Sequence, residues 1–189
     1  MIRPLVATAL ATVLAITGCG EDSARERAAG EGLPAAGAGA EEPVELAHFP
    51  LSDDGIPAGA DAVFDPVVSQ DGGGSLRVET SRGGRLRLYE LDDLGIVQGA
   101  VVYTGFLRSR GLSGQAMLEM WCQPAEGDAA FVRGAAQAVA GDSEWTSQEI
   151  RFSKPELCRS PVSIELNVLI QGSGTVWIDD LRLWSVPVG

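Results

Sequence analysis

From residue 44 to the C-terminus, hydrophobic and polar residues alternate one position at a time. The clearest run covers 162–171, where Val162, Ile164, Leu166, Val168 and Ile170 alternate with Ser163, Glu165, Asn167 and Gln171. Shorter runs of the same kind cover 76–80, 85–88 and 115–120. Successive side chains of a strand point to opposite faces, so this pattern predicts antiparallel strands with one packed and one solvated face.

Further candidate strands lie between Gly-rich breaks, at 44–49, 98–108, 130–139, 145–152 and 175–184. The breaks fall at 71–74, 83–84, 111–114, 141–142 and 172–174. Residues 129–140 are rich in Ala and have a helical alternative, which Gly134 weakens. Many short strands at regular spacing predict an all-β domain over 44–189, an antiparallel β-sandwich of the jelly-roll type.

The N-terminus has a different composition. Arg3 precedes a mostly apolar run at 5–17, which is too short to span a bilayer, and Gly18 and Cys19 follow. The stretch Ile16-Thr-Gly-Cys19 resembles the lipobox of a bacterial lipoprotein signal peptide. The resemblance implies a signal peptide over 1–18, cleavage before Cys19 and acylation of its thiol. An ordinary secretory signal or an uncleaved helix is the alternative.

That resemblance also implies a location. A protein acylated at Cys19 is anchored to a membrane of the cell envelope, in the periplasm or on the outer membrane if the host is Gram-negative. Gly20, rather than Asp, follows the cysteine and favours the outer membrane. Residues 19–43 are mainly small and polar, so we expect the lipidated cysteine and a disordered, flexible linker there, with a short helix at 23–29 as the alternative.

The net charge limits the kinds of binding partner, and the number of cysteines indicates a disulfide. The formal net charge of −12 argues against a nucleic-acid partner or an anionic lipid surface. Of the three cysteines, Cys19 is assigned to lipid, which leaves Cys122 and Cys158 as a pair. We predict a disulfide between them, because exported proteins mature in an oxidising compartment. Two free thiols or a metal pair are the alternatives, and a single histidine makes zinc improbable.

Four segments share a strand-and-turn pattern: 71–78 (DGGGSLRV), 106–118 (FLRSRGLSGQAML), 142–146 (DSEWT) and 174–183 (GTVWIDDLRL). In this order they resemble galactose-binding-like jelly rolls, a group that includes several carbohydrate-binding module families. The resemblance covers about Val44 to Leu183. It implies a non-catalytic module that binds carbohydrate or another envelope polymer. The fold supports many functions, so the resemblance is more informative about architecture than about ligand.

The same resemblance implies two kinds of site. Members of these families often hold a structural Ca²⁺ near the final strand, which here points to Asp179 or Asp180, with Asp53, Asp71 or the backbone carbonyls of the Gly72 loop as further ligands. The alternative is that one carboxylate is solvated and the other bonds loop amides. Sugar binding uses exposed aromatic rings, and Tyr103 and Trp121 are the candidates, with core packing as the alternative.

Catalytic motifs do not emerge from the sequence. His48 is the only histidine, and no nucleophile elbow, metal-binding motif or phosphate loop is present. The pairs Asp53-Asp54 and Asp92-Asp93 are more typical of turns. We therefore expect a protein that is not an enzyme, with a small esterase or glycosidase as the remaining possibility. The alternative to glycan binding is a structural or assembly lipoprotein that contacts an envelope protein through a sheet face.

Overall fold

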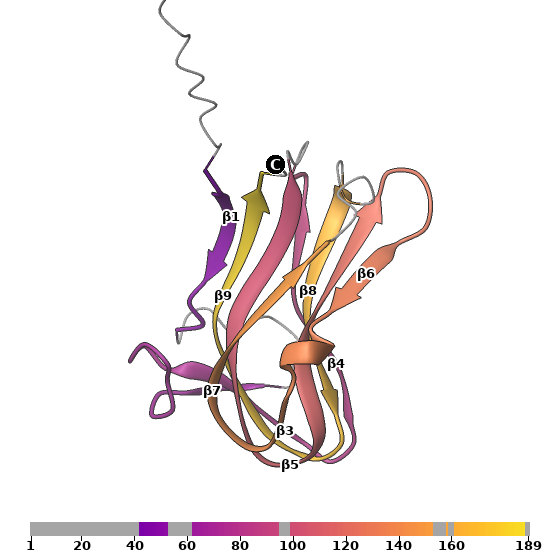
Figure 1. The fold of residues 1–189 in the computed structure, drawn as a ribbon. Coiled ribbons are helices and arrows are strands. Elements are labelled where there is room, and N and C mark those ends of the chain that lie inside the picture. The colour runs from indigo at the N-terminus through magenta and orange to yellow at the C-terminus, as the bar shows by residue number, and fades with distance from the viewer. Residues whose placement is uncertain (1–41, 53–61, 95–98, 153–157, 159–160, 188–189) are drawn as a thin grey trace, which may run out of the picture. The chain divides into compact units, whose positions relative to one another are not determined.

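Antiparallel strands dominate the computed structural model, as the alternation predicts (Figure 1). The structure describes residues 42–52, 62–94, 99–152, 158 and 161–187, all within the unit Gly39–Gly189. The expected signal peptide, Cys19 and almost all of the expected linker lie outside the described residues. The strands are β1 (Val44–Phe49), β2 (Val63–Asp65), β3 (Ser75–Thr80), β4 (Gly83–Asp92), β5 (Ala100–Pro124), β6 (Ala130–Arg133), β7 (Val139–Arg151), β8 (Pro161–Gln171) and β9 (Gly174–Val186).

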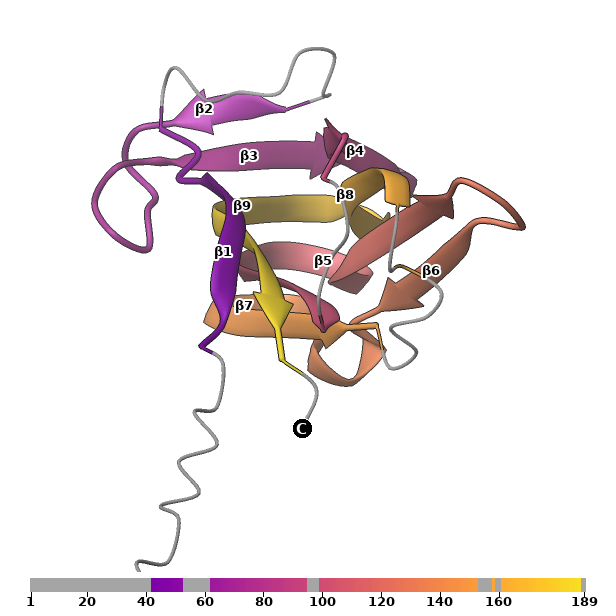
Figure 2. The same ribbon diagram turned by 90° about the horizontal axis from the view of Figure 1, so that it is seen from above.

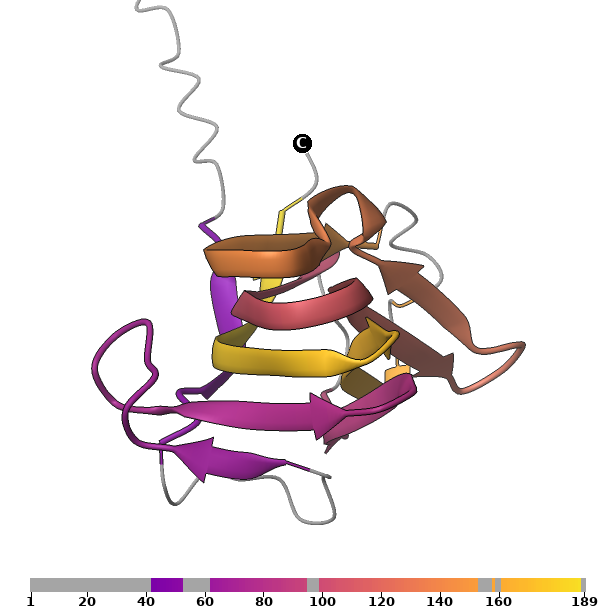
Figure 3. The same cartoon turned by 90° about the horizontal axis from the view of Figure 1, so that it is seen from below.

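The strands form two layers that share the long strand β5. In the first layer β2, β3, β9 and the first half of β5 lie side by side, with β7 on the far edge of β5 and β1 on the end of β9 (Figures 2 and 3). In the second layer β4, β8, the second half of β5 and β6 are paired. All of these pairings are antiparallel, which confirms the β-sandwich.

Two glycine-rich breaks lie inside long strands and do not end them. Gly111 and Gly141 have positive φ values of 58° and 59°, which a glycine adopts without steric cost. The Gly111 N–H donates to the Asp142 carboxylate at 2.6 Å, so the two bends are tied together. Ladder pairing continues through both bends, and the segments expected at 98–108 and 115–120 are therefore one strand.

The strand expected over 130–139 is corrected. The chain leaves β6 at Gly134, makes a single 3-10 turn at Ala135–Gln137 and begins β7 at Val139. The Gly134 N–H donates to the Leu118 carbonyl at 3.0 Å, and a Cβ at this position would lie 2.9 Å from the Ile150 side chain. This close approach to the sheet bends the chain.

Among the described residues, no helix has the length and hydrophobicity needed to cross a membrane.

The hydrophobic core lies between the two layers and takes alternate residues from stretches of β3, β5, β8 and β9. In the second layer, β5 and β8 alternate between core residues and residues on the opposite side, which we call the outer face. The fully buried aliphatic side chains of the core include Leu76, Leu118, Leu166, Ile178 and Leu183. Burial of each contributes about 1.5–3 kcal/mol, so the alternation is also the main source of stability.

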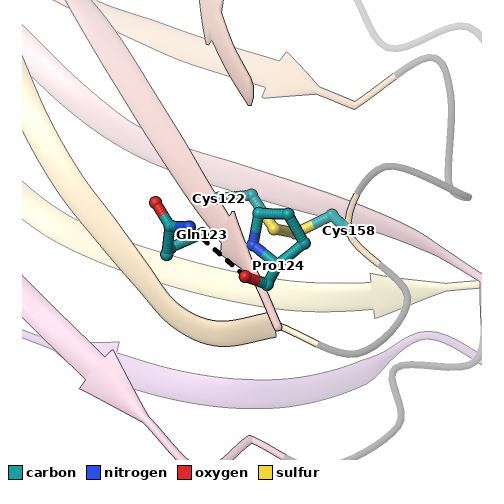
Figure 4. Close-up of a disulfide and its surroundings, with 4 residues drawn as sticks. All are labelled: Cys122, Gln123, Pro124 and Cys158. Carbon is teal, nitrogen blue, oxygen red and sulfur yellow. Dashed lines mark hydrogen bonds between the residues drawn. A yellow bond between two sulfur atoms is a disulfide. The ribbon is translucent and has the colours of Figure 1, made fainter. Parts of the chain in front are cut away.

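The predicted disulfide between Cys122 and Cys158 is confirmed (Figure 4). It joins the end of β5 to the segment that precedes β8, with 5.8 Å between the two Cα atoms. Both half-cystines are buried, with 0% and 2% of their surface exposed. Next to it, the Gln123 side-chain amide donates to the Pro124 carbonyl at 3.3 Å (Figure 4).

Candidate functional site

Register between the strands places a group of polar and aromatic residues together on the outer face of the second layer. Glu119 of β5 lies opposite Arg133 of β6 on one side and Asn167 of β8 on the other. Trp121, two residues further along β5, lies opposite Phe131. Directly opposed residues of an antiparallel pair share a face. All five therefore point away from the core.

Glu119 is the centre of an ion cluster. Its side chain is fully buried, and its two oxygens contact the Nε atoms of Arg85 and Arg133, the former at 2.5 Å. The Trp121 indole N–H donates to the same carboxylate at 2.7 Å. The arginine side chains remain 42% and 39% exposed. The carboxylate is thus held below two guanidinium groups that reach the solvent.

These contacts determine the charge of Glu119. Burial by itself raises the pKa of this carboxyl group, but the hydrogen bonds from Trp121 and Arg133 and the charges of Arg85 and Arg133 outweigh it. The net result is a pKa below the ordinary value. Glu119 is therefore ionised at neutral pH, where it acts as a fixed acceptor and not as a proton donor.

Two aromatic rings complete the group. Trp121 stacks on Phe131 with 4.7 Å between ring centroids, and Phe131 is 48% exposed. The Arg85 guanidinium carbon lies 4.5 Å from the Trp121 ring centroid, and that of Arg133 lies 4.6 Å from the Phe131 centroid. We call Arg85, Glu119, Trp121, Phe131 and Arg133 the arginine–aromatic cluster.

Asn167 lies beside this cluster, between Glu119 and Arg87 in the register. It has no exposed surface, and neither its side-chain oxygen nor its nitrogen has a hydrogen-bond partner among the described residues. A buried polar group without a partner costs about 1–3 kcal/mol. An amide that keeps this cost in the middle of an outer sheet face is a candidate ligand contact.

Of the two aromatic residues that the sequence singled out, Trp121 lies in this cluster and Tyr103 does not. Tyr103 is fully buried between the layers, where burial raises its pKa. The prediction of Tyr103 as a ligand contact is therefore corrected, because no face of its ring is open to solvent. It lies in a stretch of β5 where Val101 and Val102 are both buried, so alternation does not indicate its direction.

Asp179 matches the alternative given for the carboxylate pair, that one of them bonds loop amides. It is fully buried and accepts hydrogen bonds from the backbone N–H groups of Gln70, at 2.8 Å, and Asp180, at 2.9 Å. Burial raises the pKa of Asp179, and the negative charges of Asp71 and Asp180 add to this despite the N–H donors. Asp179 therefore fixes the loop after β2 against β9.

Asp180 has cationic partners of its own. Arg182 donates to its carboxylate at 3.0 Å, and the His48 Nε2 lies 2.7 Å from it. Burial by itself raises the pKa of Asp180, but the hydrogen bonds from Arg182 and His48 outweigh this effect. The net result is a pKa below the ordinary value. Among the described residues, no three His, Cys, Asp or Glu side chains gather as metal ligands. Asp53, one of the further ligands that the resemblance implied, lies outside the described residues, so the calcium site stays a prediction.

The other three tryptophans have structural partners. The indole N–H groups of Trp145, Trp177 and Trp184 donate to the Ser69 carbonyl, the Asp65 carboxylate and the Thr104 hydroxyl, at 3.0, 2.9 and 3.3 Å. A groove of about 380 Å³ runs beside Trp184 on the first layer. Trp177 also has the Arg108 guanidinium carbon 5.8 Å from its ring centroid, but its carboxylate partner Asp65 is only partly buried, unlike Glu119 of the second layer.

No protein-family model matches this sequence, and no curated protein matches it. Solved structures do share the fold. The CBM22-1 xylan-binding domain of Paenibacillus barcinonensis Xyn10C is similar, with a TM-score of 0.54 and 17% identity over 79% of this chain and 99% of that domain.

Two other structures are similar to a comparable degree. A xylan-binding domain from CBM 22 has a TM-score of 0.51 and 10% identity, over 71% of this chain and 87% of that one. The CBM22-1–GH10 modules of Clostridium thermocellum Xyn10B, complexed with xylohexaose, have a TM-score of 0.51 and 19% identity, over 74% of this chain and 28% of theirs. At such identities the likeness shows the fold alone, an antiparallel β-sandwich that this chain shares with these domains.

Proposed function

We propose that this protein is a non-catalytic carbohydrate-binding module whose binding surface is the outer face of the second layer. The arginine–aromatic cluster carries the proposal, because it gathers two aromatic rings and charged hydrogen-bonding groups outside the core. The fold adds support, since structures named for xylan binding share it. Sugars are recognised by apolar ring contact combined with hydrogen bonds to hydroxyl groups.

The residues of this face provide complementary chemistry. Phe131 offers exposed apolar surface, and the guanidinium groups of Arg85 and Arg133 offer N–H donors. The Asn167 amide carries both donor and acceptor atoms, which match a sugar hydroxyl that donates and accepts. Because Asn167 is fully covered, a glycan reaches it only when a neighbouring long side chain, such as that of Arg87, moves aside.

Replacing Asn167 with leucine tests this site without removing a stabilising contact. We expect the affinity for glycan to fall at least about tenfold, while the free energy of unfolding stays equal or rises, because an unpartnered buried amide is exchanged for an apolar group of similar shape. A panel of neutral and acidic polysaccharides, followed by calorimetry on the best ligand and urea unfolding, measures both quantities.

Val162→Ala is the matched control, since Val162 is an exposed residue of the same strand. Unchanged glycan affinity in the Asn167→Leu variant contradicts a ligand contact at this face. Failure of the wild-type protein to bind any polysaccharide of the panel contradicts the proposed function itself.

The assembly alternative has less support. Among the described residues, the exposed large hydrophobic side chains are Val44, Val63, Val67, Phe131 and Val162, which lie on five different segments. Protein docking through a sheet face favours a contiguous apolar patch. These scattered positions do not form one along a single strand pair.

Lipid anchoring at Cys19 is a second part of the proposal. The Ile16–Cys19 motif supports it, and the Cys122–Cys158 disulfide is consistent with an oxidising compartment outside the cytoplasm. We expect a Cys19→Ser variant to move from the membrane to the soluble fraction of cells, because it lacks the acylated thiol. Fractionation after a high-salt wash measures this, with Ser23→Ala as control. Unchanged membrane association of Cys19→Ser contradicts the anchor.

A further inference from the structure

We propose, on the basis of the proposed function, that the glycan bound at the arginine–aromatic cluster is acidic. In this inference, the carboxylate of a uronic acid residue accepts hydrogen bonds from the terminal N–H groups of Arg85 and Arg133. The ligand class is therefore a uronic-acid-bearing polysaccharide, and its neutral counterpart binds more weakly.

The first argument is the charge balance within the cluster. Two guanidinium groups share one carboxylate, Glu119, so the cluster carries one positive charge in excess. Each arginine contacts Glu119 through its Nε, and a guanidinium has four further N–H donors on its terminal nitrogens. Among the described residues these terminal donors have no carboxylate partner. Both side chains are about two-fifths exposed, at 42% and 39%, so the donors are open to an incoming anion.

The second argument is preorganisation. Glu119 is buried and ionised, and it holds both arginines from below through their Nε atoms. The aromatic rings of Trp121 and Phe131 restrict the same guanidinium groups from the side. An arginine fixed in this way loses little side-chain entropy on binding, and its planar fork matches the geometry of a carboxylate.

The third argument concerns the ring faces. A neutral sugar that stacks on an aromatic ring needs a free face of that ring. The Trp121 ring already has Arg85 over it and Phe131 stacked against it, and Arg133 lies over Phe131. The cluster thus presents two guanidinium groups to solvent beside the exposed part of Phe131, whose ring faces are already in contact with Trp121 and Arg133. Recognition by charge fits this surface better than recognition by stacking alone.

Glu165 places a negative charge beside the cluster, and its removal therefore tests whether the bound ligand is negatively charged. It lies opposite Trp121 in the β5–β8 register, on the same outer face. It is partly buried, and it forms no ion pair among the described residues. A uronate bound beside Trp121 is repelled by this carboxylate, whereas a neutral sugar is not.

The experiment uses the full chain, expressed with its own N-terminal segment and purified in detergent. Its binding to glucuronoxylan, polygalacturonate and alginate is compared with binding to the same polymers after chemical reduction of their carboxyl groups to alcohols. In low salt, we expect at least one acidic polymer to bind about tenfold more tightly than its reduced form. A factor of this size corresponds to the free energy of one charge-assisted hydrogen bond. This advantage is expected to shrink as the salt concentration rises toward about 0.5 M, because salt at that concentration screens exposed charges.

Charge variants then locate the site. Glu165→Gln is expected to bind the acidic polymer about threefold more tightly, because a repulsive charge is removed. Glu144→Gln is the matched control: it makes the same change in net charge at a residue of the first layer that is 85% exposed. Arg133→Lys is expected to weaken acidic binding severalfold, because the planar fork is lost while the charge stays.

The outcomes separate this inference from the proposed function. Equal binding of acidic and reduced polymers, or binding only of neutral polysaccharides, overturns the uronate inference and leaves carbohydrate binding intact. The uronate inference is also overturned if the acidic polymer binds more tightly but Glu165→Gln and Glu144→Gln change its affinity equally, because the binding site then lies elsewhere. Binding to no polymer in either form, together with a negative polysaccharide panel, overturns both.

Discussion

Removing both arginines that hold Glu119, in the variant Arg85→Ala/Arg133→Ala, is expected to lower the free energy of unfolding by about 3 kcal/mol at pH 7. Glu119 then loses both counter-charges, and among the described residues it keeps one hydrogen-bond donor, the Trp121 indole N–H. Water gains partial access to the carboxylate, because the two arginine side chains that lie over it are truncated. A buried charge without a counter-charge is strongly destabilising. Because the two arginines are themselves partly exposed, we take the lower end of the usual range. Urea unfolding followed by tryptophan fluorescence measures the change.

The pH dependence distinguishes this cause from a simple loss of packing. In the wild type the pKa of Glu119 lies below its ordinary value, so its contribution is fully present above the unfolded pKa of about 4.3 and is lost as pH falls through the folded pKa. In the double variant the hydrogen bond from Arg133 and the charges of both arginines no longer lower that pKa, and the bond from Trp121 is the lowering cause that remains. The wild type therefore loses more stability than the variant as pH falls below about 4, and the deficit of the variant relative to wild type shrinks.

Adding Glu119→Gln to the double variant is expected to restore part of the lost stability at pH 7, because the buried charge is gone. Arg87→Ala serves as the control. Its partner Glu90 is also on β4, and both side chains are exposed, at 60% and 42%, so the change should stay within about 0.5 kcal/mol. A stability deficit that is the same at pH 7 and at pH 4, with no effect of Glu119→Gln, contradicts an electrostatic origin.

Much of the fold follows from the alternation alone. The run at 162–171 becomes β8 with a difference of one residue at its start, and 44–49 becomes β1 without change. Strand ends were harder to predict, because Gly111 and Gly141 bend strands that continue, whereas Gly134 ends one. The same residue type does both, and the difference depends on tertiary contacts such as that between Gly134 and Leu118.

The candidate site was predictable only in part. The phase of Trp121 relative to Leu118 and Met120 indicates that it points away from the core, and the structure places it there. Its neighbours Arg85 and Phe131 belong to other strands, and cross-strand register is not visible in one sequence. One signal was available: Glu119 and Asn167 occupy the polar phase of otherwise hydrophobic strands. The contacts of Glu119 with Arg85 and Arg133, and the complete burial of Asn167, were not predictable from that phase.

The disulfide links the part of the fold that carries this cluster, since Cys122 directly follows Trp121 on β5. It closes a loop with a sequence separation of 36, which contains β6 and β7. In the chain-entropy treatment a loop of this size contributes about 4 kcal/mol by restricting the unfolded chain. The variant Cys122→Ala/Cys158→Ala is therefore expected to lose about that much free energy of unfolding.

Reduction of the wild-type protein separates the cross-link from the packing of the two sulfur atoms. We expect the reduced wild type to be less stable than the oxidised form, and the double alanine variant, which also loses buried sulfur, to be slightly less stable still. The urea m-value should rise on reduction, since an unfolded chain without the cross-link exposes more surface. If urea unfolding gives the same midpoint and m-value with both thiols demonstrably reduced, the bridge does not act through the unfolded state.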